Sequence, residues 1–423
     1  MVANLPLNVD ASRVEQRLAQ YVQKFEQENP KSGEVIRSNY TALPGGTTRA
    51  VLVHDPYPLT FVGGKGCHLT SADGDEYLDF VSEYCAGMFG HSHPDIIEAI
   101  ERVSKSGFNL GGPNQYEGEL AKRLVERFSS IDAIRMCNSG TEANTLAIAT
   151  ALAYTGRKKV LVFEDGYHGG TLSFHNHNAM ILPHQFVYGH YNDIERTKHK
   201  IDLDVGVILV EPLQGSGGMI AGDPDFLRYL RSEATRIGAV LIFDEVITSR
   251  LVYGGLQEHF GVTPDMTTIG KHFGGGFSFG AYGGRRDIMD LFNPKSPRYL
   301  NQSGTWSNNS FSMAAGIVAT GLLSREALAR TSALGDRVRD GIAEIAAAKI
   351  PGILTTSGFG SVVGLKWHGK EAEKLRELFY FYLLSQRVYI AHRGFLALNL
   401  VHDETHVQRM LYVFESFVDE VFS

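Results

Sequence analysis

The sequence has few cysteines, no long basic run and no long apolar stretch, and each shortage excludes a class of protein. Only three cysteines occur in 423 residues, Cys67, Cys85 and Cys137. They show no CxxC spacing, so neither a disulfide framework nor a zinc site is expected. The net charge is −7 and no Lys/Arg run is longer than three residues, which argues against nucleic acid as a partner.

Targeting and motif signals are equally scarce. No apolar run approaches the roughly 18 residues of a membrane span, so no membrane partner is expected. The first residues, MVANLP, lack the basic and apolar parts of a secretory signal. We therefore expect a cytoplasmic protein. The histidine pairs 91/93 and 175/177 lack a third ligand, so no metal is expected, and no GxxxxGK[ST] motif occurs.

The patterns that are present predict an α/β fold. With 423 residues, 43% of them hydrophobic, the chain is long enough for two or three domains. Short apolar runs alternate with helical patterns, as buried parallel strands joined by crossover helices do. The predicted strands are 159–163, 205–210 and 239–243, and the predicted helices are 118–130, 142–155 and 223–236.

The ends of the chain differ from this central pattern. Residues 11–28 carry apolar side chains at helical spacing, and residues 67–80 predict a hairpin. Residues 311–349 are mostly helical and lead into an α+β stretch from 360 to 423. We predict an N-terminal segment (1–75) that packs with a small C-terminal domain (321–423), and a large domain between them (76–320).

Asp244 and Lys271 each follow a strand-like apolar run and precede turn residues. A buried carboxylate and a buried amine are both costly unless each has a partner. One explanation covers both residues: a carboxylate that holds a pyridinium nitrogen, and an amine that forms a Schiff base with an aldehyde on the same ring. Two unrelated strand-end residues are the simpler alternative.

Residues 137–144, CNSGTEAN, follow an apolar stretch and open a helix. Free N–H groups at a helix start bind phosphate, and Gly140 allows close approach. Ser139 and Thr141 could add hydroxyl donors. A simple N-cap with a capping-type glutamate explains the same residues. A second Gly/Thr loop, 303–309, could supply more phosphate donors.

Tyr167, His168 and Glu211 also follow predicted strands. An aromatic side chain at a strand's carboxyl end can stack on a planar cofactor, although most such tyrosines only pack. His168 could contact the ring's edge or be structural. Ligands of open α/β sheets bind beyond the carboxyl ends of strands, which would place Glu211 beside Asp244, although a cap or salt bridge also fits Glu211.

Arg49 and Arg393 stand alone in loop-like sequence near glycines. Arginine binds carboxylates in a bidentate manner, so both are candidates for substrate binding. Surface arginines are the common alternative.

Taken together, these residues make the chain resemble the class III (subgroup II) aminotransferases of PLP fold type I. The segments that carry the resemblance occur in family order and spacing over about residues 35–420: 138–144, 167–169, 211–212, 243–246 and 270–271. Within the family the chain is most similar to bacterial β-phenylalanine aminotransferases, and next to glutamate-1-semialdehyde aminomutases. The resemblance implies a large domain with a mainly parallel sheet flanked by helices, and a smaller α+β domain.

The resemblance also implies a cofactor, pyridoxal 5′-phosphate, and roles around it. Lys271 would form the Schiff base and act as the catalytic residue, while Asp244 would pair with the pyridine nitrogen. Tyr167 would stack on one face of the ring and Val246 would pack on the other. The phosphate would be held by Ser139, Gly140 and Thr141.

Further roles follow from the same resemblance. His168 and Glu211 are expected among the cofactor-binding residues, and Thr305 would reach the phosphate of the neighbouring subunit of a homodimer whose active sites lie at the interface. Arg49 would bind the carboxylate of a β-amino acid, and Arg393 that of an α-keto acid such as 2-oxoglutarate.

The implied activity is transfer of an amino group from a β-amino acid or related amine to 2-oxoglutarate or pyruvate, by a ping-pong mechanism. An aminomutase or racemase with the same cofactor, and a non-catalytic binding protein, remain alternatives. The chain departs from the family pattern at Trp306, at Ser307 and in segment 37–48. These departures leave open which side chain the enzyme accepts on its amine substrate.

Overall fold

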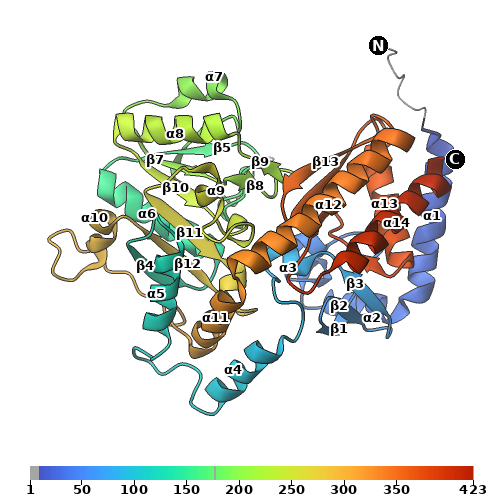
Figure 1. Ribbon diagram of the computed structural model, residues 1–423, viewed down its shortest axis with the longest axis horizontal. Coiled ribbons are helices and arrows are strands. Elements are labelled where there is room, and N and C mark those ends of the chain that lie inside the picture. Colours follow the sequence, from blue (N-terminus) through green and yellow to red (C-terminus); the bar gives the residue numbers. More distant parts are fainter. Residues whose placement is uncertain (1–8, 176–177, 423) are drawn as a thin grey trace. The chain divides into compact units, whose positions relative to one another are not determined.

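The computed structural model describes residues 9–175 and 178–422 in two compact units (Figure 1). The terminal unit comprises Met1–His93 and Thr331–Ser423, and the central unit comprises Pro94–Arg330. The first and last segments of the chain thus belong to one unit. In the described part of the chain, no helix has both the length and the apolar character needed to cross a membrane.

The central unit is built on a seven-stranded sheet of order β4-β12-β11-β10-β7-β5-β6. All pairs are parallel except the two that β12 makes with β11 and β4. This confirms the predicted mainly parallel sheet. The strands are β4 (Ala133–Cys137), β5 (Lys159–Phe163), β6 (Gln185–Gly189), β7 (Val205–Val210), β10 (Val240–Asp244), β11 (Met266–Gly270) and β12 (Gly280–Gly284).

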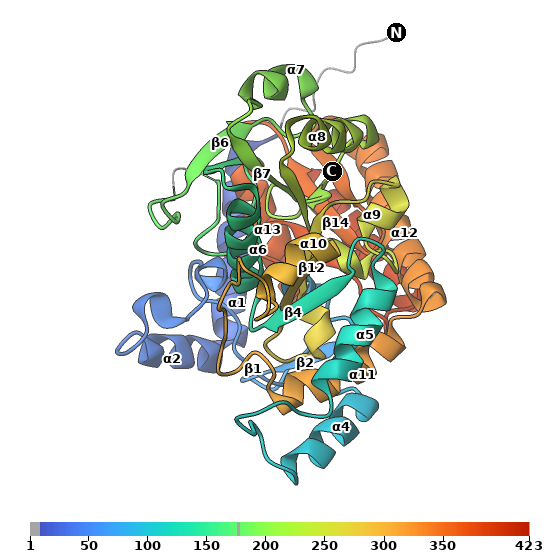
Figure 2. The same cartoon turned by 90° about the vertical axis from the view of Figure 1, so that its left-hand side faces the viewer.

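Alternate side chains of the central strands form two separate cores, one on each face of the sheet. On one face, Val160, Val207 and Val240 pack with alanines of α6 (Gly140–Thr155). On the other face, the neighbouring strand residues pack with α8 (Pro224–Ile237), which caps its end with Gly238 in the left-handed conformation. Both helices are visible in Figure 2, and they confirm the predicted crossover pattern.

Shorter elements complete the central unit. They are α4 (Pro94–Ser104), α5 (Glu117–Arg127), α7 (Ile194–Thr197), η3 (Lys198–Lys200), β8 (Leu213–Gln214), β9 (Ile220–Ala221), η4 (Thr248–Arg250), α9 (Leu256–Phe260), η5 (Lys271–Gly274), α10 (Arg286–Met289), η6 (Asp290–Phe292) and α11 (Ser310–Leu322).

The terminal unit contains two small sheets. One has the order β1-β2-β3-β15, from β1 (Phe61–Lys65), β2 (His68–Ser71), β3 (Glu76–Asp79) and β15 (Val388–Tyr389); its β2–β3 pair is the predicted hairpin. The other has the order β13-β14-β16, from β13 (Leu354–Phe359), β14 (Val362–Trp367) and β16 (Phe395–Ala397).

Helices complete the terminal unit around an aromatic core. Val14 and Phe25 on the apolar face of α1 are buried there, and the Phe25 ring lies 5.3 Å from that of Phe381 in α13. The helices are α1 (Ala11–Glu28), α2 (Pro30–Asn39), η1 (Pro44–Gly46), η2 (Ala50–Leu52), α3 (Ser82–Cys85), most of α12 (Arg325–Lys349), α13 (Ala372–Ser385) and α14 (Glu404–Phe422). The predicted helix over residues 11–28 is confirmed.

Candidate active site

Polar residues follow the carboxyl ends of five parallel strands of the central sheet. Strands β4, β5, β7, β10 and β11 end at Cys137, Phe163, Val210, Asp244 and Gly270. Each cofactor residue expected from the sequence, apart from Thr305, lies at one of these ends or within a few residues after it. Because ligands of open α/β sheets bind at this edge, the topology gathers the expected residues at one place.

Asp244 is buried, with 5% of its surface exposed, as are His168 and Glu211. Its Oδ2 accepts a hydrogen bond from Asn144 Nδ2 at 2.7 Å and lies 2.8 Å from His168 Nδ1. Its Oδ1 accepts from the Val246 amide at 3.0 Å. A buried carboxylate is tolerated when hydrogen-bonding groups surround it, and these three groups satisfy the oxygens of Asp244.

His168 is buried and contacts this carboxylate. The sequence left open whether His168 contacts the edge of the cofactor ring or is structural. The structure shows its side chain next to Asp244, the residue expected to pair with the ring nitrogen. Histidine 177 of the second histidine pair lies outside the described residues, and His91 of the first pair contacts Asp79.

Asn144 was not singled out by sequence reasoning. It is 1% exposed in α6, and besides Asp244 its Nδ2 donates to the His168 carbonyl at 3.1 Å. Its Oδ1 accepts from Thr268 Oγ1 at 2.7 Å. An asparagine in the buried face of a helix is unusual because its amide needs partners. Its place in the apolar pattern of the predicted helix is the signal by which the sequence could have identified Asn144.

Lys271 stands directly after β11 at φ +52°, a left-handed conformation that non-glycine residues seldom adopt. Such strain concentrates at functional sites, where the surroundings enforce it. A Cβ atom built on the preceding Gly270 would lie 3.6 Å from both the Gly140 amide and Val246 Cγ1. The start of α6, the turn after β10 and the lysine therefore meet at one point.

The start of α6 has the N-cap that residues 137–144 allow. Ser139 is the N-cap, and its Oγ accepts from the Glu142 amide at 3.1 Å. The first amides of a helix have no intrahelical acceptor and favour an anion. A Cβ at Gly140 would approach Val246 Cγ1 to 2.9 Å, and one at Gly169 would approach Thr141 Oγ1 to 2.2 Å. Glycine is thus required where the loops close around the helix start.

Tyr167 and Glu211 are linked through the backbone. The Tyr167 amide donates to Glu211 Oε1 at 2.9 Å, and the Gly215 amide donates to Oε2 at 3.0 Å. The pKa of Glu211 is raised to about 7, chiefly by burial; the charge of Asp244 also raises it and His168 opposes the change. The Tyr167 side chain itself is 44% exposed, so its ring is available for stacking while its backbone is fixed.

Thr305 does not follow any of these five strand ends. It is exposed in the loop before α11, and its carbonyl accepts from Asn109 Nδ2 at 2.9 Å. Within residues 9–175 and 178–422, no hydrogen bond or ion pair joins it to Asp244 or Lys271.

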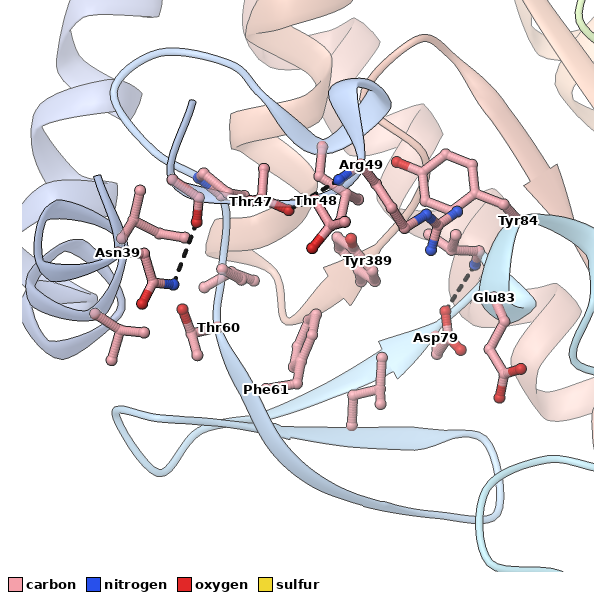
Figure 3. Close-up of a pocket in the computed structure, with 18 of the residues that line it drawn as sticks. Asn39, Thr47, Thr48, Arg49, Thr60, Phe61, Asp79, Glu83, Tyr84 and Tyr389 are labelled. Carbon is pink, nitrogen blue, oxygen red and sulfur yellow. Dashed lines mark hydrogen bonds between the residues drawn. The ribbon is translucent and has the colours of Figure 1, made fainter. Parts of the chain in front are cut away.

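Arg49 and Arg393, in the terminal unit, converge on one aromatic ring. The guanidinium carbon of Arg49 lies 4.6 Å from the centre of the Tyr84 ring, and that of Arg393 lies 6.0 Å from the same centre. Arg49 also lines a cavity of about 460 Å³ (Figure 3). Its other walls include the apolar residues Leu52, Pro58, Leu59, Phe61, Leu69 and Val81, and the polar residues Asn39, Thr47, Thr48, Thr60, Asp79, Glu83 and His91. Sequence reasoning did not identify Tyr84.

The residues of the central unit fit pyridoxal 5′-phosphate. They offer a buried carboxylate for a ring nitrogen, a helix start closed in by glycines for a phosphate, an exposed tyrosine for a ring face and a lysine in a strained turn. No single feature is diagnostic, but the four occur together at one sheet edge.

Comparisons with known proteins agree. The aminotransferase class-III family matches residues 52–398. A β-phenylalanine transaminase of Variovorax paradoxus is 40% identical over 420 residues, 96% of each chain. The crystal structure of a β-phenylalanine aminotransferase from the same species superposes with a TM-score of 0.92 at 39% identity, covering 96% of this chain and 98% of that one. A glutamate-1-semialdehyde 2,1-aminomutase of Desulforudis audaxviator is 35% identical over 431 residues, 93% of this chain and 98% of its own.

Proposed function

Since the chain belongs to the class III aminotransferases and is a transaminase with pyridoxal 5′-phosphate as its cofactor, we propose that its donor is a β-amino acid or related amine. The acceptor is an α-keto acid, 2-oxoglutarate or pyruvate, and the two half-reactions alternate in a ping-pong mechanism. The observation that carries the donor assignment is Arg49 on the wall of a largely apolar cavity, in a chain that is 40% identical to a β-phenylalanine transaminase.

Each residue of the central unit has a proposed task. When bound, pyridoxal phosphate supplies an aldehyde that takes up the amino group and a ring that withdraws electrons. Asp244 holds the proton on the ring nitrogen, and its contacts with Asn144, His168 and the Val246 amide fix the position of the carboxylate. Ser139, Gly140 and Thr141 hold the phosphate, and Tyr167 and Val246 cover the two ring faces.

Lys271 is proposed as the catalytic residue. With the cofactor bound, Lys271 would remove the proton from the amine-bearing carbon of the substrate and return it to the carbon of the cofactor's aldehyde group. Its strained turn supports this role, because a residue held at positive φ is directed by its surroundings.

The two arginines divide the substrates between them. Arg49 binds the carboxylate of the β-amino acid, and the apolar walls of its cavity suit the donor's hydrocarbon part. Arg393 binds the carboxylate of the keto acid. Planar guanidinium groups bind carboxylates through two parallel hydrogen bonds.

A homodimer is part of the proposal. Phe108, Leu110 and Trp306 are 58–60% exposed, and their loops are joined by the Asn109–Thr305 bond and by a bond from the Ser310 amide to the Phe108 carbonyl. Grouped exposed apolar side chains mark interaction surfaces. A second copy of the chain is the proposed partner because Thr305, expected to serve the neighbouring active site, lies in this group.

Substitution of the arginines tests the assignment. Arg49→Ala should lower kcat/KM for a β-amino acid about 100-fold, because a charge-assisted bidentate contact is lost. It should lower kcat/KM for an amine without a carboxylate far less. Arg393→Ala should instead lower kcat/KM for 2-oxoglutarate. Arg102→Ala, a surface arginine of α4, is the control. Equal losses on both kinds of donor would remove the proposed role of Arg49.

The aminomutase alternative has a specific support, the 35% identity to a glutamate-1-semialdehyde aminomutase. Such an enzyme needs no amino acceptor, so turnover without any keto acid would favour it.

A further inference from the structure

The segment that carries Tyr84 has an unusual backbone. Four consecutive non-glycine residues, Ser82, Glu83, Tyr84 and Cys85, have φ values of +44°, +54°, +58° and +69°. L-amino acids avoid this left-handed region because Cβ crowds the following carbonyl, and it is occupied by single residues, seldom by a full turn. A left-handed turn of this length persists only where the surroundings enforce it.

Buried polar groups hold the turn. Asp79, 1% exposed, accepts from the Val81 and Ser82 amides through Oδ1, at 2.7 and 3.2 Å, and its Oδ2 lies 2.9 Å from His91 Nε2. Ser82 Oγ donates to the Ala397 carbonyl at 2.8 Å. The turn is therefore tied to β16 and to the loop that contains His91, and its conformation is fixed from several sides.

The turn presents the Tyr84 ring to two cations. Figure 3 shows the Arg49 side chain extended beside the ring, with its guanidinium carbon 4.6 Å from the ring centre. Arg393 approaches the same ring to 6.0 Å and the Phe395 ring to 5.0 Å. Phe395 packs edge-on against Tyr84, with ring centres 5.7 Å apart. An aromatic face attracts guanidinium groups and orients their planes.

The loops that carry the two arginines are also fixed to each other. His54 and His392 stack with ring centres 4.3 Å apart and planes 13° apart. His54 follows Arg49 by one short turn, and His392 precedes Arg393. The two guanidinium groups therefore reach the shared ring from loops whose spacing is set.

From this arrangement we propose that Tyr84 is a positioning residue for both half-reactions. Its ring holds Arg49 and Arg393 in the orientations in which each receives a carboxylate, the first from the donor and the second from the acceptor. One side chain thereby sets carboxylate recognition for two substrates of different shape. This inference rests on the proposed function, which assigns one arginine to each substrate.

The test removes the ring while keeping the backbone. Tyr84→Leu keeps an apolar side chain, and Tyr84→Asn suits the left-handed conformation, in which asparagine is one of the better tolerated residues. Both variants, loaded with cofactor, should raise KM for a β-amino acid and for 2-oxoglutarate by about three- to tenfold each, the range of a guanidinium–ring contact, with kcat changed much less. Tyr84→Phe retains the ring and should restore both KM values.

Two controls make the result specific. Tyr412→Leu removes a tyrosine of α14 that is 64% exposed and should leave both KM values unchanged. An amine donor without a carboxylate should show no rise in KM in Tyr84→Leu or Tyr84→Asn. If one variant does not fold, the other gives the measurement, and circular dichroism identifies which are folded.

Several results would overturn the inference. They are a rise in KM for only one substrate, an equal rise for the carboxylate-free amine, a loss in Tyr84→Phe as large as in Tyr84→Leu, or failure of both ring-deleting variants to fold. In each of these cases the inference about Tyr84 fails. The proposed function still holds if the wild-type enzyme transaminates β-amino acids. A wild-type enzyme that accepts no β-amino acid contradicts the proposed function first, and the inference with it.

Discussion

Replacing Asn144 with alanine removes the residue that connects three strand ends at the base of the site. The side-chain amide donates to Asp244 at 2.7 Å and to the His168 carbonyl at 3.1 Å, and it accepts from Thr268 at 2.7 Å. All three bonds lie in the interior, since Asn144 is 1% exposed. Water cannot simply replace the lost partners at that depth.

The magnitude follows from the kind of each bond. The bond to the Asp244 carboxylate is charge-assisted and contributes about 1.5–3 kcal/mol, and the two neutral bonds contribute about 1 kcal/mol each. We therefore expect Asn144→Ala to lower the free energy of unfolding by about 3–5 kcal/mol. We also expect cofactor affinity to fall about tenfold, because Asp244 loses the donor that fixes its Oδ2.

Urea unfolding of the cofactor-loaded enzyme and a spectroscopic titration of the cofactor-free enzyme with pyridoxal phosphate measure the two effects. Asn301→Ala, at an exposed position in the loop before α11, is the matched control. If Asn144→Ala unfolds at the same urea concentration as the control and binds the cofactor equally well, the connecting role assigned to Asn144 is wrong.

Three further predictions concern the lysine, the buried glutamate and the dimer. Lys271→Ala should abolish turnover and the visible absorbance of the lysine-bound cofactor; retained activity would sink the assignment. Burial raises the pKa of Glu211 to about 7 from a value of 4.5, so the folded chain holds a proton that the unfolded chain releases. The resulting stabilisation, about 3 kcal/mol, is complete below pH ~4.5 and is lost as pH rises through about 7. The unfolding free energy of Glu211→Gln should therefore fall less between pH ~4.5 and about 7 than that of the wild type. The same dependence of unfolding free energy on pH in both proteins would show that Glu211 is not its cause. Trp306→Glu should shift the enzyme from dimer to monomer in size-exclusion chromatography with light scattering, whereas Tyr412→Glu should not.

The fold could be predicted where the sequence pattern is local. Strands β5 and β7 coincide with the predicted runs at 159–163 and 205–210, because continuous apolar residues bounded by turns have few other uses in an α/β protein. Strand β12, GAYGG, was not predicted. Its glycines oppose strand formation, and their reason is tertiary: a Cβ at Gly280 would meet the Ser139 carbonyl at 2.1 Å, and one at Gly284 would meet that of Asp265 at 2.4 Å.

The site divides in the same way. Asp244, Lys271 and the start of α6 could be identified because a costly polar residue or a helix-capping pattern stands beside a strand. Asn144 and Tyr84 could not, since their importance arises only when distant segments converge. The left-handed turn at Ser82–Cys85 has no glycine to announce it, and it is held by Asp79 and by the Ala397 carbonyl, which is far along the chain.

The central claim, amino transfer from a β-amino acid, is tested most directly by a single half-reaction. The cofactor-loaded enzyme is mixed with an excess of β-phenylalanine in the absence of any keto acid, and the products are quantified against active sites. The account predicts one equivalent of keto product per site, then no further reaction until 2-oxoglutarate is added, when turnover begins and glutamate accumulates. Continuous conversion of the amino acid without an acceptor, or no reaction with it at all, would contradict the account.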